Sequence, residues 1–180
     1  RPHRLRIGRY DLRDGRLVRV GSDEVDIDGP RSPLPALVGQ RRPDLLLPND
    51  DDLTYAKIQL DKRSFDTALT HAATMTYPLA RSLITGSLWE MVRTANLAPS
   101  VFLDYLLRAI PIEDHPTSLR TLLLTTKQIP SMLLATLDWY TPMADRSAAR
   151  ARALDVVRTA LDAAPAGSDQ QLQLLMSYAG

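Results

Sequence analysis

Cysteine is absent from this 180-residue chain, which excludes disulfide scaffolds, cysteine nucleophiles and thiolate metal sites. Glycine is scarce, with 8 residues, and the chain holds neither a glycine-rich phosphate loop nor the Gly-x-Ser-x-Gly turn of serine hydrolases. No apolar run approaches the roughly 18 residues that suggest a membrane span, and no leader-like segment opens the chain. The net charge of +1 gives no reason to expect nucleic acid or an anionic membrane as a partner. We therefore expect a globular protein of the cytoplasm.

The histidines are too few and too dispersed to form a local zinc motif. His3, His71 and His115 are far apart in sequence, and the H-E-x-x-H pattern of metallopeptidases does not occur. We interpret His71 as a structural residue that favours the negative end of a helix dipole, and His115 as a structural loop residue. The sequence thus predicts no catalytic, cofactor-binding or metal-ligating residue.

The acidic run Asn49–Asp52 is the strongest candidate for a cation site, and it does not fit one. A calcium-binding EF-hand loop places oxygen ligands at alternate positions and adds a central glycine and a terminal glutamate. Here the acids are contiguous and both other features are missing. We expect a solvated turn between two strands, the usual role of a short acidic run.

Aromatic and basic side chains give no clear binding motif. Trp89 and Trp139 stand among apolar residues at helical spacing, which predicts core positions. Tyr10 is the only aromatic residue before Tyr55, so a carbohydrate-binding platform has no support. We expect the helical arginines to be solvated, although an acidic partner would also suit them: Arg93, Arg108, Arg120 and Arg150.

The first sixty residues have the pattern of strands and turns. Asp14-Gly15 is a strong hairpin signal, and five prolines between Pro30 and Pro48 restrict that stretch to loop and short edge segments. Alternating or continuous apolar residues predict strands at His3–Tyr10, Leu17–Val20, Glu24–Ile27, Leu45–Leu47 and Tyr55–Leu60. This half resembles part of a small β-sandwich.

The period changes at Asp61, which is well placed to cap a first helix. Apolar spacing and prolines predict seven short helices: from Asp61 to about Ala72, Pro78 to Ala95, Pro99 to Ala109, Pro116 to the residue before Pro130, Met132 to Tyr140, Asp145 or Ser147 to Leu161, and Ser168 to Tyr178. No fixed repeat is visible. The predicted fold is α+β: a partial β-sandwich (residues 1–60), then an antiparallel, solenoid-like helical array (residues 61–180).

Two stretches carry a family resemblance: LLLPNDDDLTYAKIQLD (Leu45–Asp61) and PLARSLITGSLWEM (Pro78–Met91). They resemble the later part of M1-family zinc aminopeptidases of the actinobacterial aminopeptidase N type. The resemblance implies that residues 1 to about 60 are the end of a β-sandwich domain and the rest the start of a helical C-terminal domain. The family's H-E-x-x-H and G-A-M-E-N motifs are absent here, so no catalytic or zinc-binding residue is carried over.

The resemblance implies a non-catalytic role in a larger peptidase. The helical part would help to cover the active-site cavity and restrict which peptides enter, with zinc, the remaining domains and peptide substrates belonging to the parent enzyme. A chain that begins without methionine and ends inside a predicted helix agrees with a fragment. Alone, it should show no aminopeptidase activity and no stoichiometric zinc, and an open strand edge within residues 1–28 should favour self-association. The alternative is a stand-alone helical-array module that binds a protein partner.

Overall fold

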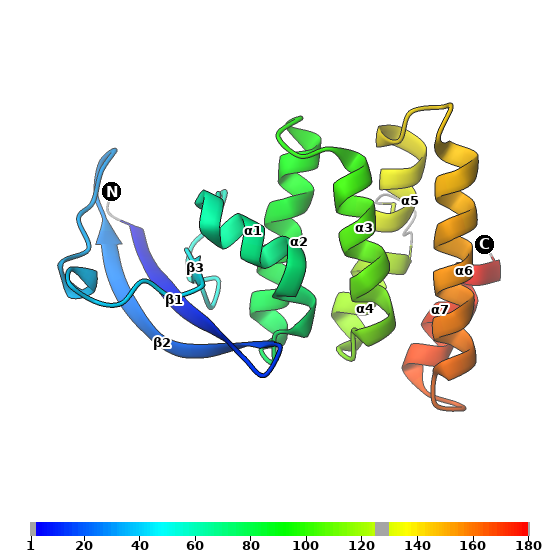
Figure 1. The fold of residues 1–180 in the computed structure, drawn as a ribbon, viewed down its shortest axis with the longest axis horizontal. Helices are drawn as coiled ribbons and strands as arrows, with labels where there is room; N and C mark the ends of the chain where they lie inside the picture. Colours follow the sequence, from blue (N-terminus) through cyan, green and yellow to red (C-terminus); the bar gives the residue numbers. More distant parts are fainter. Residues whose placement is uncertain (1–2, 125–129, 180) are drawn as a thin grey trace. The chain divides into compact units, whose positions relative to one another are not determined.

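The chain runs from a small antiparallel sheet into a series of helices (Figure 1). The computed structural model describes residues 3–124 and 130–179. By compactness the chain divides into two units, Arg1–Ser87 and Leu88–Gly180, and helix α2 (Pro78–Arg93) contributes to both. The α+β class is confirmed. The boundary predicted after residue 60 separates two domains, whereas the units above are defined by compactness alone. The predicted domain boundary therefore stays a prediction.

The sheet is built on one hairpin. β1 (His3–Arg13) pairs antiparallel with β2 (Arg16–Ile27) on one side and with the short β3 (Leu45–Leu47) on the other, giving the order β2-β1-β3. Asp14 and Gly15 both have positive φ, 49° and 77°, which is the backbone of the two-residue turn that matches strand twist. The hairpin signal read from the sequence is therefore confirmed.

Two of the predicted strands need correction. Glu24–Ile27 is not a separate strand but the second half of β2. Tyr55–Leu60 is not a strand at all: Tyr55 is fully exposed, and the carbonyl of Ile58 accepts a hydrogen bond from the Ser87 hydroxyl at 3.0 Å instead of a strand neighbour. The apolar alternation that predicted a strand includes Leu60, which is buried at the end of this irregular segment. The described residues form one sheet, so the second sheet of a sandwich is not among them.

Helix α1 (Lys62–His71) begins where the sequence predicts. The Asp61 carboxylate accepts hydrogen bonds from the amides of Arg63 (3.0 Å) and Ser64 (3.2 Å), which satisfies two donors that the first turn leaves free. The Ser64 hydroxyl also accepts from the amide of Leu46 in β3 at 2.9 Å. The helix cap and the sheet are thus joined through one serine.

The second unit is an array of helices, most of which begin at a proline or after a capping serine. The helix that follows Asp145 is the exception: Asp145 makes no side-chain cap hydrogen bond and Ser147 lies inside the helix, so the predicted cap is wrong. Beyond α2 they are α3 (Pro99–Ala109), α4 (Pro116–Leu123), α5 (Met132–Ala135), α6 (Arg146–Ala163) and α7 (Asp169–Ala179). Helix α4 packs against α5 and α7, and α6 packs against α7. The predicted fourth helix was too long: Leu124 is extended, so α4 ends at Leu123, and the remaining predicted stretch 125–129 lies outside the described residues.

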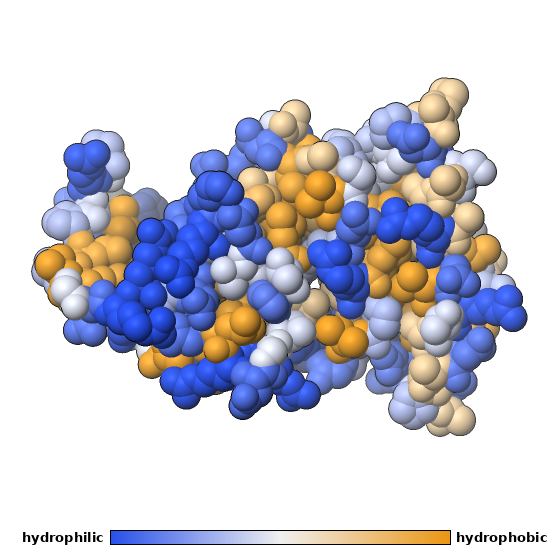
Figure 2. Space-filling model, viewed as in Figure 1, coloured by the Kyte–Doolittle hydropathy of each residue, from blue (hydrophilic) through white to orange (hydrophobic). Residues whose placement is uncertain are grey.

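Burial in the array follows the apolar stripes of the sequence. Phe102, Leu106, Ile110, Leu119 and Leu174 are fully buried, and between them they come from α3, α4, α7 and the turn after α3. On the visible face in Figure 2, apolar and hydrophilic residues are intermixed over both units.

Candidate functional site

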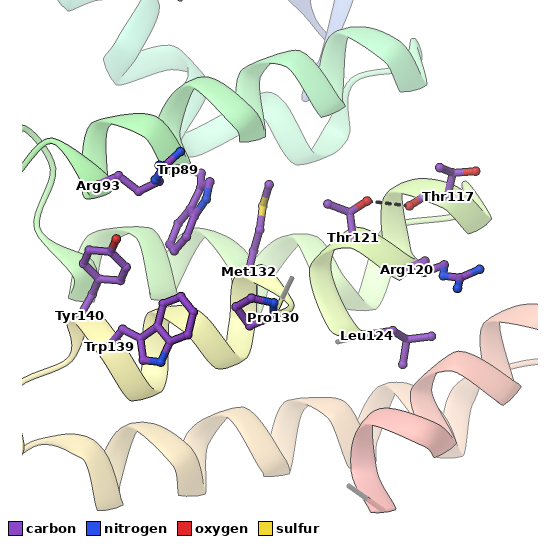
Figure 3. A pocket seen from close by; sticks show the side chains of 10 residues that line it. All are labelled: Trp89, Arg93, Thr117, Arg120, Thr121, Leu124, Pro130, Met132, Trp139 and Tyr140. Carbon is purple, nitrogen blue, oxygen red and sulfur yellow. Dashed lines mark hydrogen bonds between the residues drawn. The ribbon is translucent and has the colours of Figure 1, made fainter. Parts of the chain in front are cut away.

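A cavity of about 600 Å³ lies in the second unit beside α2, α4 and the segment that starts with α5 (Figure 3). We call it the aromatic pocket, after the residues that define it: Trp89, Arg93, Arg120, Met132, Trp139 and Tyr140. Its volume is in the range of small-ligand sites, which are mostly apolar clefts with a few polar groups. Every defining residue belongs to Leu88–Gly180.

The aromatic residues gather at one end of this pocket, as Figure 3 shows. Trp89 meets Tyr140 edge to face, with ring centroids 5.3 Å apart and an interplanar angle of 81°, and lies 5.6 Å from Phe102. Trp89 is half-buried, but Trp139 is 65% exposed, so its predicted core position is wrong. Thr136 and Leu137 are the buried residues of this turn, and a side chain two positions beyond Leu137 points to the other side of a helix.

Trp139 and Tyr140 are presented by a π-helical turn, Thr136–Tyr140, which continues α5. The amide of Thr141 donates to the carbonyl of Thr136 at 2.9 Å, and the Thr141 hydroxyl donates to the same oxygen at 2.8 Å. The Thr136 hydroxyl donates back to the Met132 carbonyl at 2.7 Å. π-helical turns are rare in proteins, and those that occur are often found at functional sites. The sequence predicted an ordinary helix here, and its only hint was threonine at both ends of the widened turn.

Positive charge accompanies the aromatic rings. The residues that line the pocket include two arginines and no carboxylate. Arg93 is paired with Glu90, with 3.1 Å between Nη1 and Oε2, whereas Arg120 forms no ion pair with any residue in the part of the chain that is described. Arg120 lies at the end of the pocket away from the aromatic rings (Figure 3). The arrangement suits a ligand that is apolar at one end and anionic at the other.

The other helical arginines do not join this site. Arg150 pairs with Asp138 at 2.6 Å, with its side chain 61% exposed, as the solvated reading predicts. Arg108 lies with Asp104 and Arg152 at a separate hollow of about 430 Å³, where Arg152 pairs with Asp104 at 2.6 Å. That hollow is a surface ion-pair cluster, and such pairs add little to stability.

The acidic turn Asn49–Asp52 is not solvated as predicted. Asp50 is completely buried, and both of its oxygens accept the Tyr10 hydroxyl at 2.9 Å. Arg19 lies 3.0 Å from Asp50 and 3.1 Å from Asp51. Asn49, Asp51 and Asp52 have positive φ, so the turn itself is as expected, but tertiary partners draw its first acid inward. We call Tyr10, Arg19, Asp50 and Asp51 the buried network.

The pKa values in the buried network follow from its geometry. Burial raises the pKa of Asp50, and the Tyr10 hydrogen bond and Arg19 only partly oppose this. For Asp51 burial acts in the same direction, but hydrogen bonds from Arg19 and Arg6 outweigh it and lower the pKa below its ordinary value. Burial and the neighbouring Asp50 charge raise the pKa of Tyr10 far above its usual range. Most of these polar groups pair with one another, which is typical of a structural network, although Nε of Arg19 is buried without a hydrogen-bond partner among the described residues.

Comparison with known proteins places the chain in a family. The profile of the family described as "ERAP1-like C-terminal domain" matches residues 45–180. The chain belongs to this family. Aminopeptidase N of Streptomyces lividans is 38% identical over 180 residues, which cover 99% of this chain and 20% of that protein. The chain therefore spans about a fifth of that relative's length, and the predicted resemblance to the C-terminal part of an aminopeptidase N is confirmed.

The residues of this ERAP1-like C-terminal domain do not fit a zinc ion. Among residues 3–124 and 130–179, no group of three histidine, cysteine, aspartate or glutamate side chains is placed to hold a metal. His71 lies in the last turn of α1 and His115 directly precedes α4, on different elements. None of the described helices is both long and apolar enough to span a membrane.

Proposed function

We propose that this chain is a non-catalytic C-terminal portion of an M1-family zinc aminopeptidase that removes N-terminal residues from peptides in the cytoplasm. Its helical array helps to cover the active-site cavity and restricts which peptides enter. The observation that carries the proposal is the 38% identity to aminopeptidase N across both the sheet and the helices of this chain.

The chemistry in this proposal belongs to residues outside the chain. Peptide hydrolysis by a zinc enzyme requires three protein ligands and a water activated by the metal. The described residues offer no such ligand set. What they offer is a helical array with a pocket of about 600 Å³, which can contact a peptide without cleaving it.

The proposal is tested first on the gene and then on the protein it encodes. We expect an H-E-x-x-H motif upstream of Arg1, and we expect the whole protein to release the fluorophore from an aminoacyl amide until a chelator removes zinc. The isolated chain should show no turnover. Chelator-sensitive turnover by the isolated chain, or an upstream sequence without the motif, would overturn the proposal.

The gating role needs a separate comparison. The whole enzyme should cleave short peptides readily and should leave the extended N-terminus of a stably folded protein intact, because a covered cavity admits only slender substrates. Equal cleavage of both substrates at matched N-terminal residues would contradict gating while leaving the catalytic assignment intact. A reproducible partner captured without the parent peptidase would instead favour the stand-alone interaction module.

A further inference from the structure

We propose that Arg19 is a relay that couples the acidic turn Asn49–Asp52 to the first turn of helix α2. Arg19 lies on β2, and its guanidinium contacts both the carboxylates of the acidic turn and the ring of Tyr77, the residue directly before α2. All of these residues belong to the first unit, Arg1–Ser87. The inference goes beyond the proposed function and does not depend on it.

The guanidinium of Arg19 holds the acidic turn through two carboxylates. Nη2 of Arg19 lies 3.0 Å from Oδ2 of Asp50 and donates to Oδ2 of Asp51 at 3.1 Å, while Nη1 donates to Oδ1 of Asp51 at 3.3 Å. The two bonds to Asp51 form a parallel pair, which fixes the orientation of a guanidinium as well as its distance. Because the Arg19 side chain is only 23% exposed, water weakens these contacts less than it would on the surface.

The same guanidinium contacts the start of α2. Its Cζ lies 5.3 Å from the ring centroid of Tyr77, which is within the range of a cation–π interaction. The carbonyl of Tyr77 accepts a hydrogen bond from the amide of Arg81 at 3.1 Å, so Tyr77 is tied to the first turn of the helix. Among the described residues no hydrogen bond or ion pair joins Tyr77 to the acidic turn directly. Arg19 is therefore the contact that the two segments share.

The acidic turn depends on such contacts to keep its shape. Asn49 and Asp51 have φ values of 57° and 70°, and left-handed backbone in residues other than glycine persists where the surroundings impose it. The turn also lies tightly against β1, since a Cβ on Gly8 would be 2.0 Å from Oδ2 of Asp50. Arg19 is itself under some tension, because its Nε is buried without a hydrogen-bond partner among the described residues. A segment held in this way opens locally when the contact that holds it is removed.

The relay acts on the helix that the two compact units share. Helix α2 contributes to both units, so a contact at its first turn can transmit a change in the sheet to the helices that follow. Helix α1 has its own attachment to the sheet, through the Ser64 hydroxyl that accepts the amide of Leu46 at 2.9 Å. A change at the acidic turn should therefore reach α2 through Arg19 and leave α1 in place.

Amide hydrogen exchange, resolved by residue with NMR under conditions where the rate follows the opening equilibrium, tests this coupling. The amide of Asp50, which donates to the Arg6 carbonyl at 2.8 Å, reports on the acidic turn, and the amide of Arg81 reports on α2. Arg19→Gln should speed the exchange of both amides by roughly tenfold or more, because it removes hydrogen bonds between charged groups. Arg9→Gln is the matched control and should change neither amide: the Arg9 side chain is 26% exposed and pairs with Asp23 within the hairpin.

Tyr77→Leu separates a relay from simple stabilisation, because it removes the ring and leaves the bonds between Arg19 and the acidic turn in place. We expect Tyr77→Leu to speed the exchange of the Asp50 amide about two- to fivefold, the factor that corresponds to a partly exposed cation–π contact. Coupling between two sites is reciprocal and requires the element that joins them. In the Arg19→Gln background the same substitution should therefore have no further effect on Asp50.

The inference is overturned if Tyr77→Leu leaves the exchange of Asp50 unchanged, if its effect persists in the Arg19→Gln background, or if Arg9→Gln acts like Arg19→Gln. The amide of Phe65, which donates to the Asp61 carbonyl at 2.8 Å in the first turn of α1, is the internal reference. Unchanged exchange at Phe65 supports local opening along the relay. An increase at Phe65 as large as that at Arg81 would mean general unfolding of the first unit and would also overturn the inference.

Discussion

Replacement of Asp50 by alanine should destabilise the first unit more than any single exposed substitution. Asp50 is completely buried, accepts the Tyr10 hydroxyl at 2.9 Å and lies 3.0 Å from Arg19. Removing one partner of a buried ion pair leaves the other charge uncompensated, and this typically costs about 3–5 kcal/mol. Arg19 keeps Asp51 at 3.1 Å and is 23% exposed, so we expect the lower end, about 3 kcal/mol.

A double-mutant cycle separates the contribution of the Tyr10 hydroxyl to stability from that of the Asp50 charge. Tyr10→Phe removes one hydrogen bond to a carboxylate, for which we expect a loss of about 1.5 kcal/mol. The double variant should lose less than the sum of the two, because Tyr10 and Asp50 share that hydrogen bond. Asp66→Ala is the control: Asp66 is 55% exposed and pairs with Lys62 on the helix surface, so the change should be within about 0.5 kcal/mol.

The assay is urea unfolding followed by far-ultraviolet circular dichroism. Both tryptophans belong to the second unit, so their fluorescence follows that unit separately. Unfolding of a chain with two compact units need not be a single transition, and the two probes reveal whether it is. A loss for Asp50→Ala no larger than that for Asp66→Ala would refute the reasoning that Asp50 is buried and paired.

Four further outcomes can be checked with the same protein. Gly8→Ala should cost about 1–3 kcal/mol in urea unfolding, because its Cβ would lie 2.0 Å from Oδ2 of Asp50. Asp61→Ala should cost about 1 kcal/mol as a lost helix cap and lower the thermal midpoint. In an acid titration, stability should fall as the pH drops below about 4. The groups responsible are four carboxyls whose pKa values are lowered by folding: Asp26, Asp44, Asp51 and Asp61. Their contribution to stability is complete at neutral pH and is lost as the pH falls through the lowered pKa values. The raised pKa of Asp50 acts in the opposite sense. Sedimentation should show concentration-dependent association through the free edge of β2, and a strictly monomeric profile would count against it.

Local signals in the sequence predicted most of the fold. Asp14-Gly15 set the hairpin and Asp61 set the start of α1, because each acts through bonds to residues a few positions away. Prolines placed the starts of α2, α3 and α4, since a missing amide does least harm in a first turn. The α+β class and the array of helices followed from these local choices.

What the sequence did not predict depends on partners distant in the chain or on departures from regular helix. Asp50 is buried because Tyr10, forty positions away, donates to it, and no local pattern encodes that contact. Tyr55–Leu60 has the alternation of a strand but pairs with no strand among the described residues, and strand pairing depends on tertiary contacts. The aromatic pocket was missed for a similar reason: Trp89, Arg120 and Trp139 come from three elements, and only packing brings them together.

The two places where local rules failed differ in a way that separates structure from function. Natural sequences break local rules mainly at strained or functional sites. In the buried network most of the unexpected polar groups pair with one another within the first unit. Tyr10 and Arg19 both contact Asp50, although Nε of Arg19 has no hydrogen-bond partner among the described residues. In the aromatic pocket the unexpected groups lack such partners among the described residues, since Trp139 is 65% exposed and Arg120 has no counter-ion. Buried groups that pair with one another stabilise the fold, whereas exposed groups without partners are accessible to a ligand. This difference favours the aromatic pocket over the acidic turn as a candidate binding site.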